Sequence, residues 1–290
     1  MGVISRPFGM LLQWLNSMVG NYGVALILFT VIVRVILLPL AIKQQKSMLE
    51  TQKIQPEMAK IREKYKNDKE KLNEETMKLY KEHNVNPAGG CLPLLIQFPI
   101  IIGLFSVIRN PLTYMFNLTH EQIEKLANLV NVVINTKNSY EIQIAQKLTP
   151  DILQSADISN VGMINFNFLG INLGDTPNMS IINLLWIIPV LAAVTTYLST
   201  KVMSSVSGNQ NANDSAASTM KTMNMIFPFM TAWFAFSMPA GVGLYWILGN
   251  IIQIPQQILL NRYFNAKKAG NPLVIEKHDK KPNKGGGKKK

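Results

Sequence analysis

The chain has 290 residues, of which 48% are apolar and 16% are charged, and its 29 Lys and Arg against 17 Asp and Glu give a net charge of +12. This apolar content excludes an intrinsically disordered chain. The single cysteine, Cys91, excludes an internal disulfide, and three scattered His argue against a metal centre. The apolar residues are bunched into long runs between charged stretches, which indicates an integral membrane protein.

Residues 1–20 carry Ile4, Phe8, Leu11 and Leu15 at helical spacing, with polar residues on the other faces. This pattern predicts an amphipathic helix that lies in the membrane interface, on the outer face. The alternative is an uncleaved first span. A secretory signal is disfavoured, because no small-residue cleavage site follows.

Five apolar segments are expected to cross the membrane, since a bilayer core of about 30 Å needs about 20 apolar residues in a helix. They are residues 22–42, 89–110, 181–200, 222–237 and 242–261. The last two are predicted to form a hairpin, because residues 237–241 (SMPAG) contain the Pro and Gly that break a helix. The predicted fold class is an all-α membrane protein with five transmembrane helices, a cytoplasmic helical hairpin and an N-terminal interfacial helix.

The orientation follows from the distribution of Lys and Arg, which are enriched in cytoplasmic loops. Residues 43–87 hold eleven of them and the tail 262–290 holds ten, whereas residues 111–180 hold three against six acids. The N-terminus is therefore predicted outside and the C-terminus in the cytoplasm. Residues 111–180 become an extracellular segment, and residues 201–221 become a cytoplasmic loop.

The charged stretch 43–87 is predicted to be a cytoplasmic helical hairpin. Met58, Ile61 and Tyr65 are spaced as on one helical face, and Asn67 followed by Glu70 indicates the N-cap of a second helix. A solvated linker that only joins two spans is an equal alternative.

Residues 262–290 form a basic cytoplasmic tail, and from Lys277 onward this tail is a flexible polycation, because its lysines alternate with Gly and Pro and cannot build a core. Anionic lipid headgroups would attract it, and so would the phosphates of ribosomal RNA. A purely topogenic role under the positive-inside rule is the third possibility. No DNA partner is expected.

Arg34 is the main candidate for a functional residue. Fourteen Val, Ile, Leu and Phe between residues 22 and 42 outweigh the cost of about 3 kcal/mol for one central Arg, so the span still inserts. Eight residues, or roughly 12 Å of helix, separate Arg34 from Ile42. This distance is too long for full snorkelling, so the side chain is expected to need water or an acidic partner.

No Asp or Glu lies in any predicted span, so hydration is the expected answer. Thr30, Gln97 and three glutamines of the last span could line a wet cavity that opens to the cytoplasm; the glutamines are Gln253, Gln256 and Gln257. Alternatively, Arg34 bonds backbone carbonyls that are freed by Pro39. No catalytic group, cofactor or metal site is expected, because the spans lack the groups for acid or base chemistry.

Three segments together resemble the YidC/Oxa1/Alb3 membrane protein insertases. They are the Arg34 span with its Pro39, residues 89–99 (GGCLPLLIQFP) and residues 239–250 (PAGVGLYWILGN). The similarity covers about residues 21–263, apart from the extracellular stretch. The order of five spans with a charged loop after the first matches as well.

The resemblance implies an insertase that receives weakly hydrophobic proteins in a hydrophilic groove open to the cytoplasm and to lipid. The family's groove arginine falls on Arg34, and its polar and aromatic companions fall on Thr30, Gln97 and Trp246. The resemblance also implies nascent membrane proteins as clients, work beside the Sec translocon and the ribosome, and a bacterial plasma membrane as the location.

Two departures from the family pattern stand out. No cysteine precedes Cys91, so no lipoprotein anchor is expected, and residues 117–177 exceed the usual link. The large extracytoplasmic domain of Gram-negative relatives is absent, which suggests a bacterium with a single membrane. The main rival function is a small-molecule secondary transporter, although no internal repeat is visible.

Overall fold

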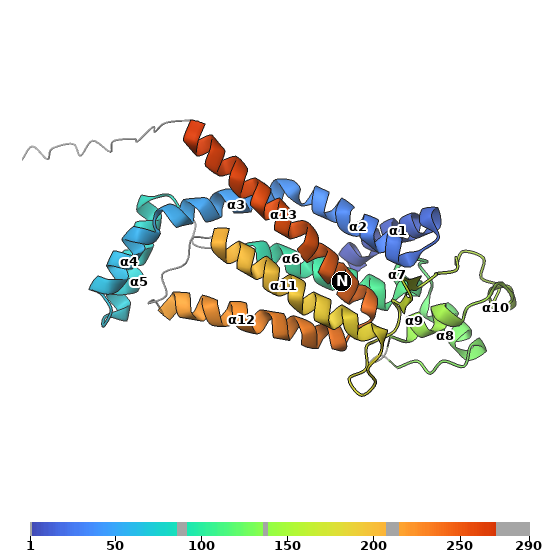
Figure 1. The fold of residues 1–290 in the computed structure, drawn as a ribbon. Coiled ribbons are helices and arrows are strands. Elements are labelled where there is room, and N and C mark those ends of the chain that lie inside the picture. The colour runs from blue at the N-terminus through green and yellow to red at the C-terminus, as the bar shows by residue number, and fades with distance from the viewer. Residues whose placement is uncertain (1, 86–91, 136–138, 207–214, 271–290) are drawn as a thin grey trace, which may run out of the picture.

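The computed structural model describes residues 2–85, 92–135, 139–206 and 215–270. It is mostly helical and elongated, with a charged helical hairpin at one end and a small cap at the other (Figure 1). Between them lies a bundle of long helices, of which α11 packs against both α12 and α13, and α13 packs against α2. The bounds of the bundle helices are α2 (Tyr22–Ile36), α6 (Leu92–Arg109), α11 (Ile187–Val206), α12 (Ser215–Phe236) and α13 (Ala240–Gly270).

The first predicted span is broken rather than straight. α2 ends at Ile36, and α3 (Leu38–Lys53) continues from it at an angle of 54°. Pro39 lies at the start of α3, where its missing N–H costs no hydrogen bond, and its ring disfavours helical conformation in the residue before it. The span over residues 22–42 stays a prediction, but its helix bends at Leu37 and then runs on to Lys53.

Only one helical stretch of the described residues, 184–205, is long and apolar enough to cross a membrane by itself. It joins a short 3-10 turn (Leu184–Trp186) to α11. The bent pair of α2 and α3 passes the same criterion jointly, while the apolar parts of α6 and α12, Phe98–Arg109 and Met225–Phe236, are shorter. The count of five spans remains a prediction.

The α12–α13 connection is short. α12 ends at Phe236 and α13 begins at Ala240, within the turn expected at residues 237–241. The N–H groups of Ala240 and Gly241 donate to the carbonyls of Asp175 and Leu173, both at 2.8 Å. The cap therefore fixes the end of this helix pair.

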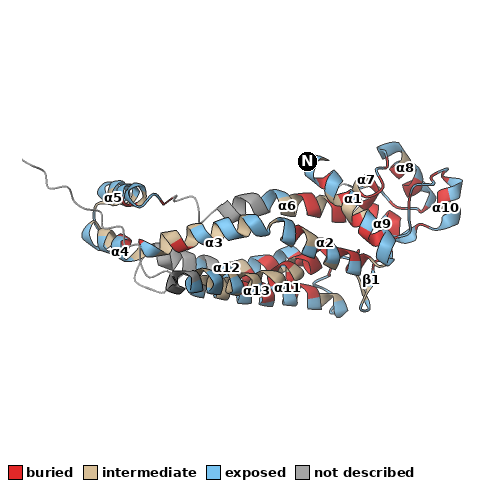
Figure 2. Ribbon diagram, turned by 90° about the horizontal axis from the view of Figure 1, so that it is seen from above, coloured by how far each residue is buried: buried red, intermediate tan, exposed pale blue. Residues whose placement is uncertain are grey.

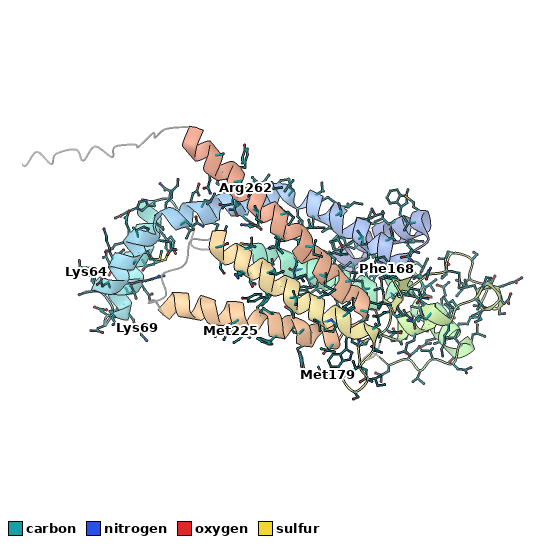
Figure 3. The ribbon with its side chains drawn as sticks, viewed as in Figure 1. Lys64, Lys69, Phe168, Met179, Met225 and Arg262 are labelled. Atoms are coloured by element: carbon teal, nitrogen blue, oxygen red, sulfur yellow. The ribbon has the colours of Figure 1, made fainter. Side chains whose placement is uncertain are left out.

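The charged region forms two helices, α4 (Gln55–Lys64) and α5 (Lys69–Glu82), that fold back on each other. A small separate core joins them, made of Ile54, Met58, Leu79 and Val85. The N-cap of α5 is Asp68, whose carboxylate accepts from the Lys71 N–H at 3.1 Å, so the expected Asn67 cap is wrong by one residue. Lys64 and Lys69 lie at the far end of this hairpin in Figure 3.

Residues 111–180, for which the sequence offers no account, fold into a compact cap. Its helices are short, and its two strands pair antiparallel with Asn167 opposite Asn172. The elements are α7 (Pro111–Tyr114), α8 (His120–Leu129), α9 (Tyr140–Lys147), α10 (Pro150–Ser155), β1 (Asn167–Phe168) and β2 (Ile171–Asn172). Figure 2 shows buried residues running from the bundle into this cap, and the two share one apolar core.

Glu141 is a buried carboxylate in the cap. It accepts hydrogen bonds from the Thr113 N–H at 2.8 Å and from the Thr113 hydroxyl at 2.7 Å, which ties α9 to α7. Removal from water raises the pKa of this carboxyl above its ordinary value, and the two bonds from Thr113 only partly oppose that shift. The cap therefore contains a carboxyl group that holds its proton more tightly in the folded protein than in water.

The N-terminal helix α1 (Gly2–Val19) packs against α2, α6 and α7. Leu12 and Leu15 are buried on one face, while Met10 and Trp14 are exposed on the other. Gly9 approaches the Tyr114 backbone so closely that a Cβ would clash with its carbonyl. The location of α1 in the membrane interface stays a prediction.

Candidate functional site

Arg34 lies in the last turn of α2 and is half-buried against α13. Its Nη2 donates to the Gly249 carbonyl at 2.8 Å and lies 3.5 Å from the Gln253 Oε1. The bend at Leu37 thus places Arg34 near the end of a helix, where a cation also interacts favourably with the helix dipole. The acceptor is a carbonyl of another helix and not one freed by Pro39.

Of the other expected site residues, Thr30 and Trp246 are both hydrogen-bonded within the helix bundle, but on different helices. Thr30 is fully buried, and its hydroxyl donates to the Leu26 carbonyl of its own helix at 2.7 Å. Trp246 is half-buried in α13, and its indole N–H donates to the Thr196 hydroxyl at 3.2 Å. Gln97 lies in α6, but its side chain is outside the part of the chain that the structure describes.

A polar stripe runs along one face of α13. Its members are Trp246, Asn250, Gln253 and Gln257, whose spacings of four, three and four residues keep them on one side of a helix. Trp246 and Asn250 bond to α11, whereas Gln253 faces Arg34 and Gln257 bonds to Gln45 of α3. The stripe therefore links α13 to three other helices, α2, α3 and α11, through polar side chains.

At the N-terminal end of the stripe, Asn250 is only 8% exposed and anchors α13 to α11. Its Nδ2 donates to the Thr196 hydroxyl at 2.9 Å and to the Thr195 hydroxyl at 3.2 Å. Buried amides are costly unless they are hydrogen-bonded, so this contact selects one rotation of α11 against α13. Sequence reasoning missed Asn250, Thr195 and Thr196, although the spacing from Trp246 to Gln257 offered a signal for Asn250.

At the C-terminal end of the stripe, Gln257 contacts a second buried amide, that of Gln45 in α3. Gln45 is 2% exposed, its Oε1 accepts from Gln257, and its Nε2 has no hydrogen-bond partner among the described residues. Gln257 was an expected groove residue, whereas Gln45 was not. A buried amide with a spare donor is a place where water or a polar guest group would be stabilised.

Gly249 determines how closely Arg34 can approach α13. A Cβ on Gly249 would lie 2.9 Å from the Arg34 Nη2, which is too close for a real side chain. A glycine at this position therefore leaves room for the guanidinium beside the backbone carbonyl.

No group of three His, Cys, Asp or Glu that could hold a metal ion occurs among the described residues.

Comparison with known proteins gives consistent results. The family model of the 60Kd inner membrane protein matches residues 14–268. The chain is 34% identical over 266 residues to the membrane protein insertase YidC of Fusobacterium nucleatum subsp. nucleatum, covering 92% of this chain and 96% of that protein. It is 32% identical over 262 residues to the YidC of Caldanaerobacter subterraneus subsp. tengcongensis, covering 90% and 96%.

A longer relative is the YidC of Maridesulfovibrio salexigens, which is 31% identical over 260 residues that make up 90% of this chain and 38% of that protein. Among solved structures, a crystal structure of an active YidC insertase with its first transmembrane domain resolved is similar. Its TM-score is 0.49 at 29% sequence identity, with 83% of this chain and 42% of that chain covered.

Proposed function

The chain belongs to the 60Kd inner membrane protein family and is a membrane protein insertase, and we propose that it receives its clients in a hydrophilic groove around Arg34. It acts in a bacterial membrane on nascent membrane proteins and is not an enzyme. A secondary transporter, the main rival function, is not favoured by relatives that are named insertases.

The observation that carries the groove is the half-buried Arg34 guanidinium beside a polar stripe. Arg34, Gln253, Gln257 and Gln45 bring a cation and three amides together between α2, α3 and α13. No carboxylate contacts Arg34 in the described part of the chain, so its charge is available to a guest segment. Thr30, Gln97 and Trp246 are proposed as further groove residues.

The proposed mechanism lowers the cost of moving polar groups through lipid. Each unsatisfied backbone group in the bilayer core costs several kcal/mol, so a polar leading segment crosses only slowly by itself. Polar side chains and water around Arg34 would stabilise that segment part of the way, and an acidic one most of all. The apolar segment of the client then leaves sideways into lipid, driven by burial of its own apolar surface.

The proposed topology has five spans, with the N-terminus outside and the C-terminus in the cytoplasm. It is supported by eleven Lys and Arg in residues 43–87 and ten in residues 262–290, against three in the cap. The α4–α5 hairpin and the Arg34 end of α2 then lie toward the cytoplasm. The basic tail is proposed to contact anionic lipids and the ribosome, and the insertase to work beside the Sec translocon.

Reconstitution tests this function. Purified protein in liposomes should insert a small single-spanning client, measured as the fraction protected from added protease, and empty liposomes should insert much less. Transport of a solute without client insertion would favour the rival function. Insertion that is equal with and without the protein would contradict the proposed role.

A further inference from the structure

A pocket of about 540 Å³ lies where the cap meets the bundle, at the opposite end of α13 from the Gln45–Gln257 contact. It is formed by the end of α6, by α9, by the loop after β2 and by the α12–α13 turn. The lining residues used below are Phe105, Arg109, Gln146, Asp175, Leu185 and Pro239. Neither Arg34 nor any other proposed groove residue lines it, so this pocket is a separate feature of the molecule.

One side of the pocket offers a cation. Arg109 is the last residue of the apolar helix α6, which is the position where a membrane helix meets the headgroup layer. Its Cζ lies 5.7 Å from the centre of the Phe105 ring, within the range of a cation–π contact. A guanidinium carries five N–H donors and a permanent positive charge, so it can donate to a phosphate oxygen while it keeps its other contacts.

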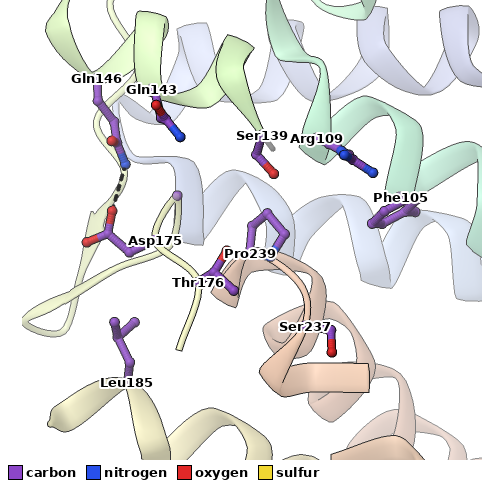
Figure 4. Close-up of a pocket in the computed structure, with 11 residues that line it drawn as sticks. Phe105, Arg109, Ser139, Gln143, Gln146, Asp175, Thr176, Leu185, Ser237 and Pro239 are labelled. Atoms are coloured by element: carbon purple, nitrogen blue, oxygen red, sulfur yellow. Dashed lines mark hydrogen bonds between the residues drawn. The ribbon is translucent and has the colours of Figure 1, made fainter. Parts of the chain in front are cut away.

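The other side offers an anion. Asp175 accepts from the Gln146 Nε2 at 3.1 Å, and Figure 4 shows this pair across the pocket from Arg109. The bond from a neutral amide fixes the carboxylate and uses only part of its acceptor capacity. A primary ammonium, which has three donors and a positive charge, is the group that such a carboxylate would accept best.

The mouth of the pocket is apolar on the side that leads to the bundle. Leu185 and Pro239 line the pocket, and exposed apolar residues lie on both sides of Leu185 in the chain, up to the start of α11. Ile182 is 83% exposed and Leu184 is 56% exposed, and Ile187 follows in the first turn of α11. An apolar surface that begins at a charged pocket and continues along a membrane helix fits a lipid better than a soluble ion.

We propose that this pocket binds the headgroup of a phospholipid that carries both a phosphate and a primary ammonium. The phosphate lies against Arg109, the ammonium against Asp175, and the acyl chains run over Leu185 toward α11. This site goes beyond client insertion, since it would tie the cap to the lipid surface at the end of the bundle remote from Arg34.

Native mass spectrometry of the full chain, extracted from bilayers of defined composition, tests the proposal. The probes are phosphatidylethanolamine, phosphatidylcholine, which lacks N–H donors, and phosphatidylglycerol, which lacks the cation. The wild type should retain one phosphatidylethanolamine in preference to the other two. Free phosphoethanolamine, which is the same headgroup without acyl chains, should compete only weakly with the bound phosphatidylethanolamine.

Two variants and two matched controls locate the site. Arg109→Gln should lower retention of both phosphatidylethanolamine and phosphatidylglycerol about tenfold, the effect of losing one charged hydrogen bond. Asp175→Asn, at an exposed side chain, should lower phosphatidylethanolamine retention alone. Lys69→Gln, at the far end of the α4–α5 hairpin (Figure 3), and Asp151→Asn on the cap surface likewise remove one positive and one negative charge, and neither should have an effect.

Equal retention of phosphatidylethanolamine in the wild type, Arg109→Gln and Asp175→Asn would overturn the proposal. Equal retention of phosphatidylcholine would overturn the role of Asp175, and displacement by free phosphoethanolamine at lipid-like concentration would overturn the lipid as the ligand. The Arg34→Ala protein should keep its bound lipid. Loss of client insertion with the lipid retained would therefore concern the groove alone, and loss of the lipid would concern this pocket.

Discussion

The Arg34 guanidinium donates to the backbone carbonyl of Gly249 at 2.8 Å, across the contact between α2 and α13. A Cβ at residue 249 would lie 2.9 Å from the donating nitrogen, so an alanine there would require the Arg34 side chain to shift away from the carbonyl. The cation is thus held beside α13 by backbone rather than by an acid. No carboxylate contacts the guanidinium in the described part of the chain, which is what the proposed groove for acidic or polar segments requires.

Gly249→Ala should displace Arg34 without unfolding the protein. Loss of a hydrogen bond from a charged group costs about 1.5–3 kcal/mol, whereas alanine gains about 1 kcal/mol of helix propensity, so the free energy of unfolding should fall by only about 1 kcal/mol. Client insertion in liposomes should fall more than thermal stability does. Gly162→Ala, where a Cβ meets only ordinary contact with Phe116, is the control. An unchanged insertion rate for Gly249→Ala would contradict the role of this fit.

Asn250 and Thr196 should be energetically coupled. Asn250→Ala leaves the Thr196 hydroxyl without its amide donor, and Thr196→Val removes the acceptor while it keeps the side-chain shape. Each change should destabilise the protein by about 1–3 kcal/mol, and the double variant should lose less than the sum. Thermal unfolding in detergent measures the cycle, with the exposed Asn265→Ala as control. Strict additivity would show that the contact does not fix α11 on α13.

Glu141 should make the cap more stable at mildly acidic pH. Burial raises the pKa of its carboxyl in the folded state, so the folded protein binds the proton more tightly than the unfolded chain does. Its contribution is therefore largest below the ordinary carboxyl pKa and is lost as the pH rises through the raised value.

The unfolding temperature of the wild type should accordingly fall between pH 4 and pH 7 by more than that of Glu141→Gln, which has no proton to lose. Glu121→Gln, at an exposed position of α8, should keep the wild-type pH dependence. The same slope in wild type and Glu141→Gln would show that this carboxyl does not titrate in the range.

Asp68→Ala should loosen the α4–α5 hairpin, whereas Asn67→Ala should not. The Asp68 carboxylate caps α5 through the Lys71 N–H, and loss of an N-cap costs about 1 kcal/mol. Hydrogen exchange of the α5 amides in the full chain should become roughly fivefold faster, which is the rate change that corresponds to that cost. Faster exchange in Asn67→Ala instead would place the cap where the sequence alone suggested it.

The sequence predicts the organisation of the chain because apolar runs and charge clusters carry that information directly. The turn at residues 237–241 follows from its Pro and Gly, and Arg34 stands out because a charge in an apolar run is rare. The bend at Leu37 and the shift of the N-cap from Asn67 to Asp68 depend on one-residue differences that helical periodicity does not resolve.

The tertiary contacts could not be predicted in the same way. Asn250 and Thr196 lie 54 residues apart, and nothing in either apolar run indicates that they face each other. The cap is built from short helices whose packing on one another has no signal in the sequence, so its core and the pocket beneath it appear only once the chain is folded. The glycine at position 249 matters through its neighbour Arg34 and not through its own backbone conformation.

The most direct test of the central claim is rescue of cells depleted of this protein. Newly made single-spanning proteins with acidic leading segments are scored for protease accessibility after expression of wild type, Arg34→Lys, Arg34→Ala or the control Arg6→Ala, at an exposed side chain of α1. A groove that acts through its charge predicts that Arg34→Lys and Arg6→Ala restore most insertion and that Arg34→Ala leaves clients stalled inside. Full rescue by an Arg34→Ala protein present at wild-type levels would contradict it.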